Sequence, residues 1–233
     1  MRVVPCAGSP TPRLLRACAI FGLGVEASSR ARAAAPHEST LAAAHAARLD
    51  HLLRPGERAL VTGPSGAGKT TLLRALAAHL RRRGQRPIVL REHEPALDDR
   101  FVADALGATL DGTLDALARA GLADAILLTR RVRDLSRGER YRLALARAIL
   151  AAERAARRRT RRAPARGVTL IADEFASLLD RATARSICLG LARRGHPWVR
   201  LVVATAHEDV REWLSAHVIA AGEQGPERAG GGA

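Results

Sequence analysis

Residues 63–70 read Gly-Pro-Ser-Gly-Ala-Gly-Lys-Thr, between an apolar run and an amphipathic one. The preceding segment Arg58–Thr62 (RALVT) predicts a short buried strand. The following segment Thr71–Arg83 (TLLRALAAHLRRR) repeats its leucines at helical spacing and stops at Gly84. The stretch fits G-x-x-x-x-G-K-[ST] in the strand-to-helix setting that binds nucleotide phosphates. It therefore predicts a phosphate-binding loop.

The residue types of this loop explain its chemistry. Glycines let successive backbone N–H groups turn inward around a β-phosphate, and the helix that follows adds its positive end. Lys69 supplies a point charge to the β- and γ-phosphate oxygens, and the Thr70 hydroxyl is a ligand for Mg²⁺. The residues predicted to bind the nucleotide here are Gly63, Pro64, Ser65, Gly66, Ala67, Gly68, Lys69, Thr70 and Thr71.

Composition and periodicity favour a helix-rich α/β fold. Apolar residues make up 47% of the chain but aromatic residues only 3%, which disfavours a β-sandwich. Apolar runs at 87–91, 168–172 and 199–204 predict further strands, and residues 138–152 and 182–194 predict helices between them. Because strands alternate with helices, we expect a P-loop NTPase with a mostly parallel sheet flanked by helices.

Two acids follow the apolar run Val168–Ala172. A buried strand places Asp173 and Glu174 at the carboxyl edge of the sheet, where phosphates bind in open α/β folds. Asp173 can hold Mg²⁺, and Glu174 can polarise the attacking water. Taken alone, the two carboxylates could instead cap the start of a helix.

The stretch Leu135–Leu150 (LSRGERYRLALARAIL) resembles the signature of ABC-type ATPases, Leu-Ser-Gly-Gly-Gln followed by a long helix. The resemblance implies that Ser136 and Gly138 bind the γ-phosphate of ATP held by the opposite subunit. Each site would then be complete only in a head-to-tail homodimer that forms when ATP binds. Without the other motifs, the same residues describe a capped helix start.

Residues 173–180 (DEFASLLD) are similar to the Walker B motif and D-loop of the same family, with Phe175 in place of proline. The likeness implies a catalytic Glu174 and a nucleotide-contacting Asp180. His207, after the strand at 199–204, fits the family's switch histidine, which senses the γ-phosphate. The resemblance spans about residues 52–220 and implies catalytic roles for Lys69, Glu174 and His207, with ATP and Mg²⁺ as cofactors.

The sequence departs from a transporter subunit between the phosphate loop and the signature. Residues 91–97 (REHEPAL) resemble the family's Q-loop context but put His93 at the glutamine position, where it is a candidate metal contact or a surface histidine. The helical subdomain, at about 95–150, is shorter than in most transporter subunits. No Tyr or Phe precedes Leu60 closely enough to be assigned to adenine stacking.

Five segments organise the chain. We expect a poorly ordered N-terminal extension at 1–37, the ATPase domain at 38–221 and a disordered tail at 222–233. Within the domain lie the helical subdomain and a basic insertion at 154–166. Three scattered cysteines fit a reducing cytosol, and no run approaches the apolar length of a membrane span, so we expect a cytoplasmic protein.

Several details are similar to one non-transport branch, the ABC-type ATPases joined to a predicted acetyltransferase domain. These are Asp173-Glu174-Phe175, the run 179–184 (LDRATA), the signature continuation 140–142 (RYR) and the run 204–209 (ATAHED). No region of acetyltransferase size accompanies them. Only the ATPase portion of the branch could apply here.

The net charge of +15 leaves two interpretations. The basic insertion at 154–166 could bind nucleic acid phosphates, or it could be a solvated loop in an arginine-rich chain. The sequence favours a non-transport ATPase acting on a protein or nucleic acid partner. The alternative is the ATP-binding subunit of a membrane transporter, paired with a permease. A small-molecule kinase would leave Ser136, Asp180 and His207 unexplained.

Overall fold

A computed structural model describes the chain over residues 2–7, 12–20, 23–28, 36–90, 99–160 and 167–221. The chain divides into two compact units, residues 1–41 and residues 42–233. Among the helices within the described ranges, none is both long and apolar enough to cross a membrane.

The first unit contains a small parallel sheet. Strand β1 (Arg2–Ala7) pairs in parallel with β2 (Leu23–Ser28), and helix α1 (Pro12–Ile20) connects them. These three elements lie within residues 1–37, for which the sequence predicts a poorly ordered extension. Pro5 in β1 and Gly24 in β2 are residue types that strand interiors rarely carry, which is why the pattern did not predict strands there.

The second unit is built on a five-stranded sheet in the order β4-β5-β6-β3-β7, with every pairing parallel. Its strands are β3 (Arg58–Thr62), β4 (Ile88–Val89), β5 (Val168–Ala172), β6 (Val199–Ala204) and β7 (His217–Ala220). The predicted parallel sheet is confirmed. The edge strand β7 was not predicted, because its four residues are too few to produce a clear period.

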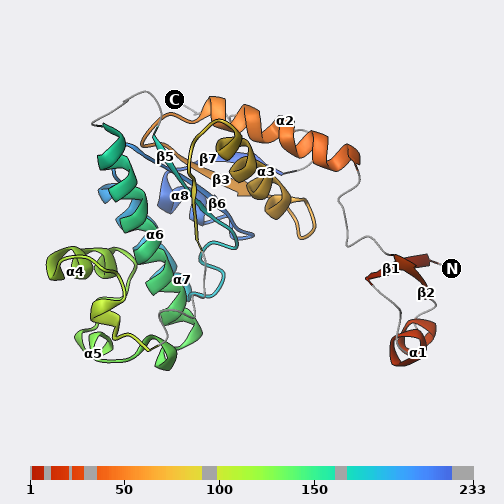
Figure 1. Ribbon diagram of the computed structural model, residues 1–233, viewed down its shortest axis with the longest axis horizontal. Helices are drawn as coiled ribbons and strands as arrows, with labels where there is room; N and C mark the ends of the chain where they lie inside the picture. The colour runs from red at the N-terminus through yellow and green to blue at the C-terminus, as the bar shows by residue number, and fades with distance from the viewer. Residues whose placement is uncertain are drawn as a thin grey trace. The chain divides into compact units, whose positions relative to one another are not determined.

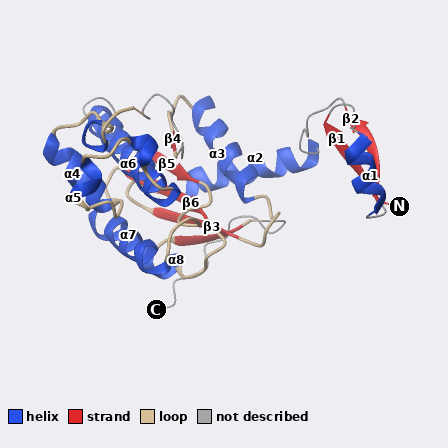
Figure 2. Ribbon diagram, turned by 90° about the horizontal axis from the view of Figure 1, so that it is seen from below, coloured by secondary structure: helices blue, strands red, loops and turns tan. Residues whose placement is uncertain are grey.

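Helices cover both faces of this sheet (Figures 1 and 2). On one face lie α2 (Pro36–Leu52) and α3 (Lys69–Arg82); on the other lie α6 (Arg137–Thr160), α7 (Arg181–Arg194) and α8 (Val210–Leu214). Alternate strand residues serve the two faces, as the strand period of two requires. In β6, for example, Val202 packs with the α2 and α3 side, while Leu201 and Val203 pack with the α6 and α7 side.

A small helical subdomain packs against α6 (Figure 1). It contains α4 (Leu110–Arg119), α5 (Ala125–Leu128) and two short 3₁₀ turns, η2 (Val102–Asp104) and η3 (Val132–Asp134). Thr109 caps α4 by accepting a hydrogen bond from the Gly112 N–H, and Asp124 caps α5 from the Ile126 N–H. The subdomain and the face of the sheet under α6 share one apolar core.

The predicted basic insertion at 154–166 begins within a helix. Residues 154–160 continue α6 as helix and do not form a loop. Arginine and alanine are good helix formers, so the run extends the signature helix instead of ending it. Residues 161–166 lie outside the described residues, as does the tail at 222–233.

A buried arginine joins the amino ends of the central strands to α2. The guanidinium of Arg200, on β6, donates to the Thr169 hydroxyl at 2.7 Å and to the Asp50 carboxylate at 2.8 Å. It also donates to the Gln85 side-chain oxygen at 3.2 Å. A buried charge is tolerable only when it is paired and hydrogen-bonded in this way.

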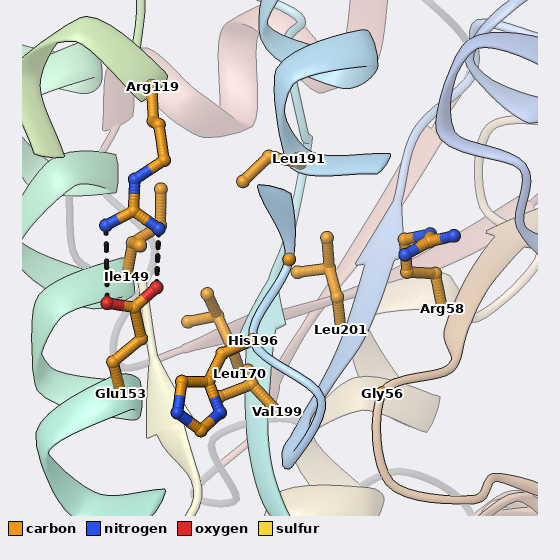
Figure 3. A pocket seen from close by; sticks show the side chains of 11 residues that line it. Gly56, Arg58, Arg119, Ile149, Glu153, Leu170, Leu191, His196, Val199 and Leu201 are labelled. Carbon is orange, nitrogen blue, oxygen red and sulfur yellow. Dashed lines mark hydrogen bonds and ion pairs between the residues drawn. The ribbon is translucent and has the colours of Figure 1, made fainter. Parts of the chain in front are cut away.

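A second buried ion pair connects the subdomain to α6. The guanidinium of Arg119, on α4, contacts both carboxylate oxygens of Glu153, with Nη1–Oε1 at 2.5 Å and Nη2–Oε2 at 3.3 Å. The pair lines a cavity of about 40 Å³ at the amino ends of the strands, beside Arg58 and His196 (Figure 3). The exposed carboxylate of Asp115 also contacts Arg119, at 2.9 Å.

Replacing Glu153 with leucine should lower the free energy of unfolding by about 3 kcal/mol, because Arg119 would keep a buried charge without its main partner. Denaturation followed by the fluorescence of Trp198 and Trp213 measures this. The double variant Arg119→Leu/Glu153→Leu should recover most of the loss. Asp115→Ala is the control and should cost less than about 1 kcal/mol. A Glu153 variant no less stable than the Asp115 variant would contradict the assignment.

Candidate nucleotide-binding and catalytic site

The predicted phosphate loop lies between β3 and α3, at the carboxyl edge of the sheet. Gly66 and Gly68 have φ values of 83° and 84°, which turn the backbone through the left-handed region that favours glycine. A Cβ added at either position would meet nothing within 4 Å, so both glycines face open space. The start of α3 at Lys69 directs its positive end toward that space. The loop therefore fits a phosphate group.

The chain packs tightly at Gly63. A Cβ placed there would lie 3.1 Å from the Cβ of Ala67 and 3.3 Å from the carbonyl oxygen of Ala221, and φ is 146°. The Ala221 N–H donates to the Thr62 carbonyl at 2.8 Å, which extends the pairing of β7 with β3. Residues just after β7 thus support the first glycine of the loop.

Lys69 folds back over the loop. Its Nζ donates to the carbonyl oxygens of Gly63 at 2.7 Å and Pro64 at 2.9 Å. These contacts hold the ammonium group beside the open space, where phosphate oxygens would need a positive charge.

Three neighbouring strands end together at this edge. Val61 pairs with Ala204, and Ala172 pairs with Val203, so β3, β6 and β5 end in register. The phosphate loop follows β3, Asp173 and Glu174 follow β5, and Thr205 to His207 follow β6. The structure therefore brings the predicted loop, acids and histidine to one edge of the sheet.

The turn after β5 carries Glu174 in a strained conformation. Its φ is 46°, and that of Ala176 is 60°, which non-glycine residues rarely adopt. The Phe175 N–H donates to the Ala204 carbonyl at 2.7 Å, and the Phe175 side chain is fully buried. Where the family motif has proline, this chain anchors the turn with an aromatic ring.

The start of α6 forms a capping box. The Ser136 N–H donates to the Glu139 carboxylate at 2.7 Å, and the Glu139 N–H donates to the Ser136 hydroxyl at 3.3 Å. The bond from the Ser136 N–H lowers the pKa of Glu139. The capped helix start and the signature resemblance therefore describe the same residues and do not exclude each other.

Asp180 and His207 are placed by local contacts. Asp180 caps α7 by accepting a hydrogen bond from the Thr183 N–H at 2.9 Å. Hydrogen bonding to the Thr183 side chain, together with this backbone bond, lowers the pKa of Asp180. The His207 N–H donates to the Thr205 hydroxyl at 3.2 Å. Two residues further along, Asp209 pairs with Arg181 at the start of α7, with Nε–Oδ2 at 3.0 Å.

Within the described part of the chain, no group of three or more His, Cys, Asp or Glu side chains could hold a metal ion by itself. Mg²⁺ sites in nucleotide enzymes need only one or two protein oxygens, because phosphates and waters supply the rest. Thr70 and Asp173 therefore stay the predicted donor set. His93, the third metal candidate, lies outside the described residues.

Known proteins match this chain over a stretch that includes the phosphate loop and the start of α6. Residues 47–156 match the family model described as ABC transporter. The lipoprotein-releasing system ATP-binding protein LolD 1 of Rhodopirellula baltica is 30% identical over 187 residues, which cover 66% of this chain and 76% of that protein. The chain belongs to the ABC transporter ATP-binding cassette family. It is an ABC-type ATPase.

Two other relatives of this ABC ATPase match over shorter stretches. The zinc import ATP-binding protein ZnuC of Ruegeria pomeroyi is 37% identical over 41% of this chain and 42% of its own length. The cytochrome c biogenesis ATP-binding export protein CcmA of Rhizobium meliloti is 35% identical over 42% of this chain and 60% of its own. The resemblance to the branch joined to a predicted acetyltransferase domain stays a prediction.

Solved structures share the fold of the ABC ATPase. The dimeric bacterial ABC transporter cassette MJ0796 superposes with a TM-score of 0.53 at 19% identity, over 76% of this chain and 85% of that chain. A bacterial Atm1-family ABC exporter with ATP bound gives the same TM-score at 18% identity, over 74% of this chain and 33% of that chain.

The motifs did not indicate how the turn at 173–180 is held. Tyr141, on α6, accepts a hydrogen bond from the Ala176 N–H, and its side chain is buried. Arg181 also lies over the Trp213 ring, 4.9 Å from its centroid. The one available signal for Tyr141 is its rarity, because it is the only tyrosine in the chain.

Glu139→Ala should lower the free energy of unfolding by about 1 kcal/mol at neutral pH, because α6 loses a capping acceptor. The folded-state pKa of Glu139 is lowered, so this stabilisation is present above its ordinary value of 4.5 and is lost as pH falls through the lowered value. Denaturation at a series of pH values should show the difference from the unmodified chain shrinking in acid. Glu139→Gln, which keeps an acceptor oxygen, should lose less. A difference that grows in acid would contradict the cap.

Proposed function

We propose that the chain is the ATP-binding subunit of an ABC membrane transporter, bound to a permease at the cytoplasmic face. Three relatives carry names of lipoprotein-releasing, zinc import and cytochrome c biogenesis export ATP-binding proteins. The sequence favours a non-transport role because of the short helical subdomain, His93 and the basic run at 154–166; of these, His93 and residues 161–166 lie outside the described part of the chain.

One observation of the structure carries the proposal. The helical subdomain exposes large apolar side chains to solvent: Leu110 is 63% exposed, Leu114 41% and Ile126 67%. Leu110 and Leu114 lie four residues apart on α4, so they share a face of that helix. Exposed apolar patches on a protein surface commonly mark sites of interaction with a partner. A permease segment is the partner that fits this family.

In the proposed reaction the loop Gly63–Thr71 holds the phosphates, and the Lys69 ammonium stabilises charge on the transferred group. Mg²⁺, when bound by Thr70 and Asp173, neutralises phosphate charge. Glu174 orients and polarises the attacking water at the carboxyl edge of the sheet. His207 lies after β6 and senses the γ-phosphate. The strained φ of Glu174 supports a functional role for this turn.

The proposed active form is a head-to-tail homodimer. Ser136, Gly138 and Asp180 of one copy would complete the site around ATP on the other copy. The start of α6 suits this role because a helix N-terminus carries a positive dipole end that can meet an anion. The Ser136 and Glu139 N–H groups are held within the capping box, so the proposed contacts are the Ser136 hydroxyl and the Gly138 N–H.

Glu174→Gln should slow ATP hydrolysis by about 10²-fold or more, because the glutamine cannot accept a proton from water. ATP binding should persist, so the variant should accumulate as a dimer with Mg-ATP. Light scattering and single-turnover hydrolysis measure the two effects. Lys69→Ala is the control, which should lose tight ATP binding and stay monomeric. A monomeric Glu174→Gln chain at saturating Mg-ATP would rule out the dimer.

A non-transport ATPase acting on a protein or nucleic acid is the second candidate. The net charge of +15 supports it, as do the exposed Arg154 and Arg158 near the end of α6. Within the described residues, however, Arg154 donates to the Gly107 carbonyl at 2.7 Å, and so part of this charge serves the fold.

Leu114→Glu and Ile126→Glu should abolish copurification with a membrane permease, because a charge in an apolar interface is strongly unfavourable. The tagged chain is recovered from detergent-solubilised membranes of its native cell. ATP hydrolysis by the purified variants should be unchanged. Leu41→Glu, at an exposed leucine of α2, is the matched control and should copurify normally.

Two results would contradict the transporter role. One is recovery of the unmodified chain without any membrane-spanning protein. The other is ATPase stimulation by DNA or RNA that fades as salt rises, which counterion release would produce. Either outcome would favour the second candidate.

A further inference from the structure

We infer that Tyr141 is a positioning residue for ATP hydrolysis, because its hydroxyl holds the turn that carries Glu174. The inference rests on the proposed roles of Glu174 and Ser136. Tyr141 lies on α6, within the signature helix, and is far along the chain from the turn at 173–180. None of the sequence motifs assigned it a function.

The contact is direct and buried. The Ala176 N–H donates to the Tyr141 Oη at 3.0 Å, while Tyr141 is 1% exposed and Ala176 is 0% exposed. A buried backbone N–H requires an acceptor, and water cannot readily reach this one. The phenol hydroxyl therefore determines whether the turn can keep this geometry.

The turn needs external support. Glu174 and Ala176 both have positive φ values, at 46° and 60°. Non-glycine residues hold such conformations only when surrounding contacts fix them. Two contacts from different elements do so here: the Ala204 carbonyl of β6 accepts from the Phe175 N–H, and Tyr141 of α6 accepts from the Ala176 N–H.

The two contacts join the turn that carries Glu174 to two elements that bear other proposed site residues. The β6 anchor leads within three residues to His207, and the α6 anchor leads back to Ser136. Tyr141 is five residues after Ser136, about 7.5 Å along a helix at 1.5 Å per residue. A Cβ added at Gly138 would lie 3.6 Å from the Leu178 carbonyl, so the start of α6 also packs beside the turn.

One chain thus links two different sites of the proposed dimer. Ser136 would contact ATP held by the partner copy, whereas Glu174 would act on ATP held by its own copy. Because Tyr141 joins these elements rigidly, engagement of one phosphate at the start of α6 biases the direction of Glu174 at the other site. Tyr141 would therefore act through Glu174 and not on the substrate itself.

Tyr141→Phe tests the role, since phenylalanine keeps the ring and removes the hydroxyl. The expected result is a fall in kcat of about tenfold with KM for ATP within about twofold, because geometry at the water changes while phosphate binding does not. Thr113→Val is the matched control: it removes another buried hydroxyl, on α4 and outside the turn, and should leave both constants unchanged.

Amide hydrogen exchange in the full chain measures whether the hydrogen bond from the Ala176 N–H to Tyr141 is present. In the unmodified protein the Ala176 amide should be protected about as well as the Phe175 amide. In Tyr141→Phe, exchange at Ala176 should accelerate about tenfold or more relative to the Thr183 amide, which Asp180 holds independently. The first measurement needs no variant, so it tests the contact even if Tyr141→Phe folds poorly.

Three outcomes would overturn the inference: an unprotected Ala176 amide in the unmodified chain, a Tyr141→Phe kcat within twofold of the original, or a lower kcat with unchanged exchange at Ala176. Failure of the proposed function gives different results. Full hydrolysis by Glu174→Gln would remove the role of Glu174, and absence of a permease would remove the transporter role. Neither result changes the exchange at Ala176.

Discussion

The pairing of β6 with β3 on one side and β5 on the other governs the arrangement of the site. Because the three strands are parallel and end in register, the chain segments that follow them meet at one edge of the sheet. The phosphate loop lies more than a hundred residues before the two acids in the sequence, and His207 lies 33 residues after Glu174. A change of strand order would separate them, even if each motif kept its residues.

The helices on the two faces of the sheet hold different parts of this edge. Helix α3 fixes the phosphate loop on one face, with Leu72, Leu76 and Leu80 in the core. The opposite face carries α6 and α7, which start beside the turn after β5. Buried ion pairs lie at the other end of the strands, where Arg200 joins the sheet to α2 and Arg119 joins α4 to α6. Charges that stabilise the fold are thus separated from charges that meet the nucleotide.

Much of the fold and site could be predicted from local patterns. The strands at 58–62, 168–172 and 199–204 have strongly apolar runs, and their predicted bounds match the structure. The phosphate loop and the two acids could be predicted because each is a short run of residues at fixed spacing. The hydrogen bond between Tyr141 and Ala176 could not be predicted, because it joins residues far apart in sequence and depends on an unusual backbone turn. The extension of α6 through residue 160 was missed because arginine-rich runs suit both helices and loops.

The contact between Gly63 and Ala221 has a consequence for proteins fused to this chain. The last paired residue of the sheet lies against the first glycine of the phosphate loop, so whatever follows residue 221 in a polypeptide begins at the nucleotide edge. A domain or affinity tag joined directly after residue 221 would start beside the first glycine of the phosphate loop. Cutting or fusing the chain at that residue would therefore act on the support of Gly63 as well as on the edge of the sheet.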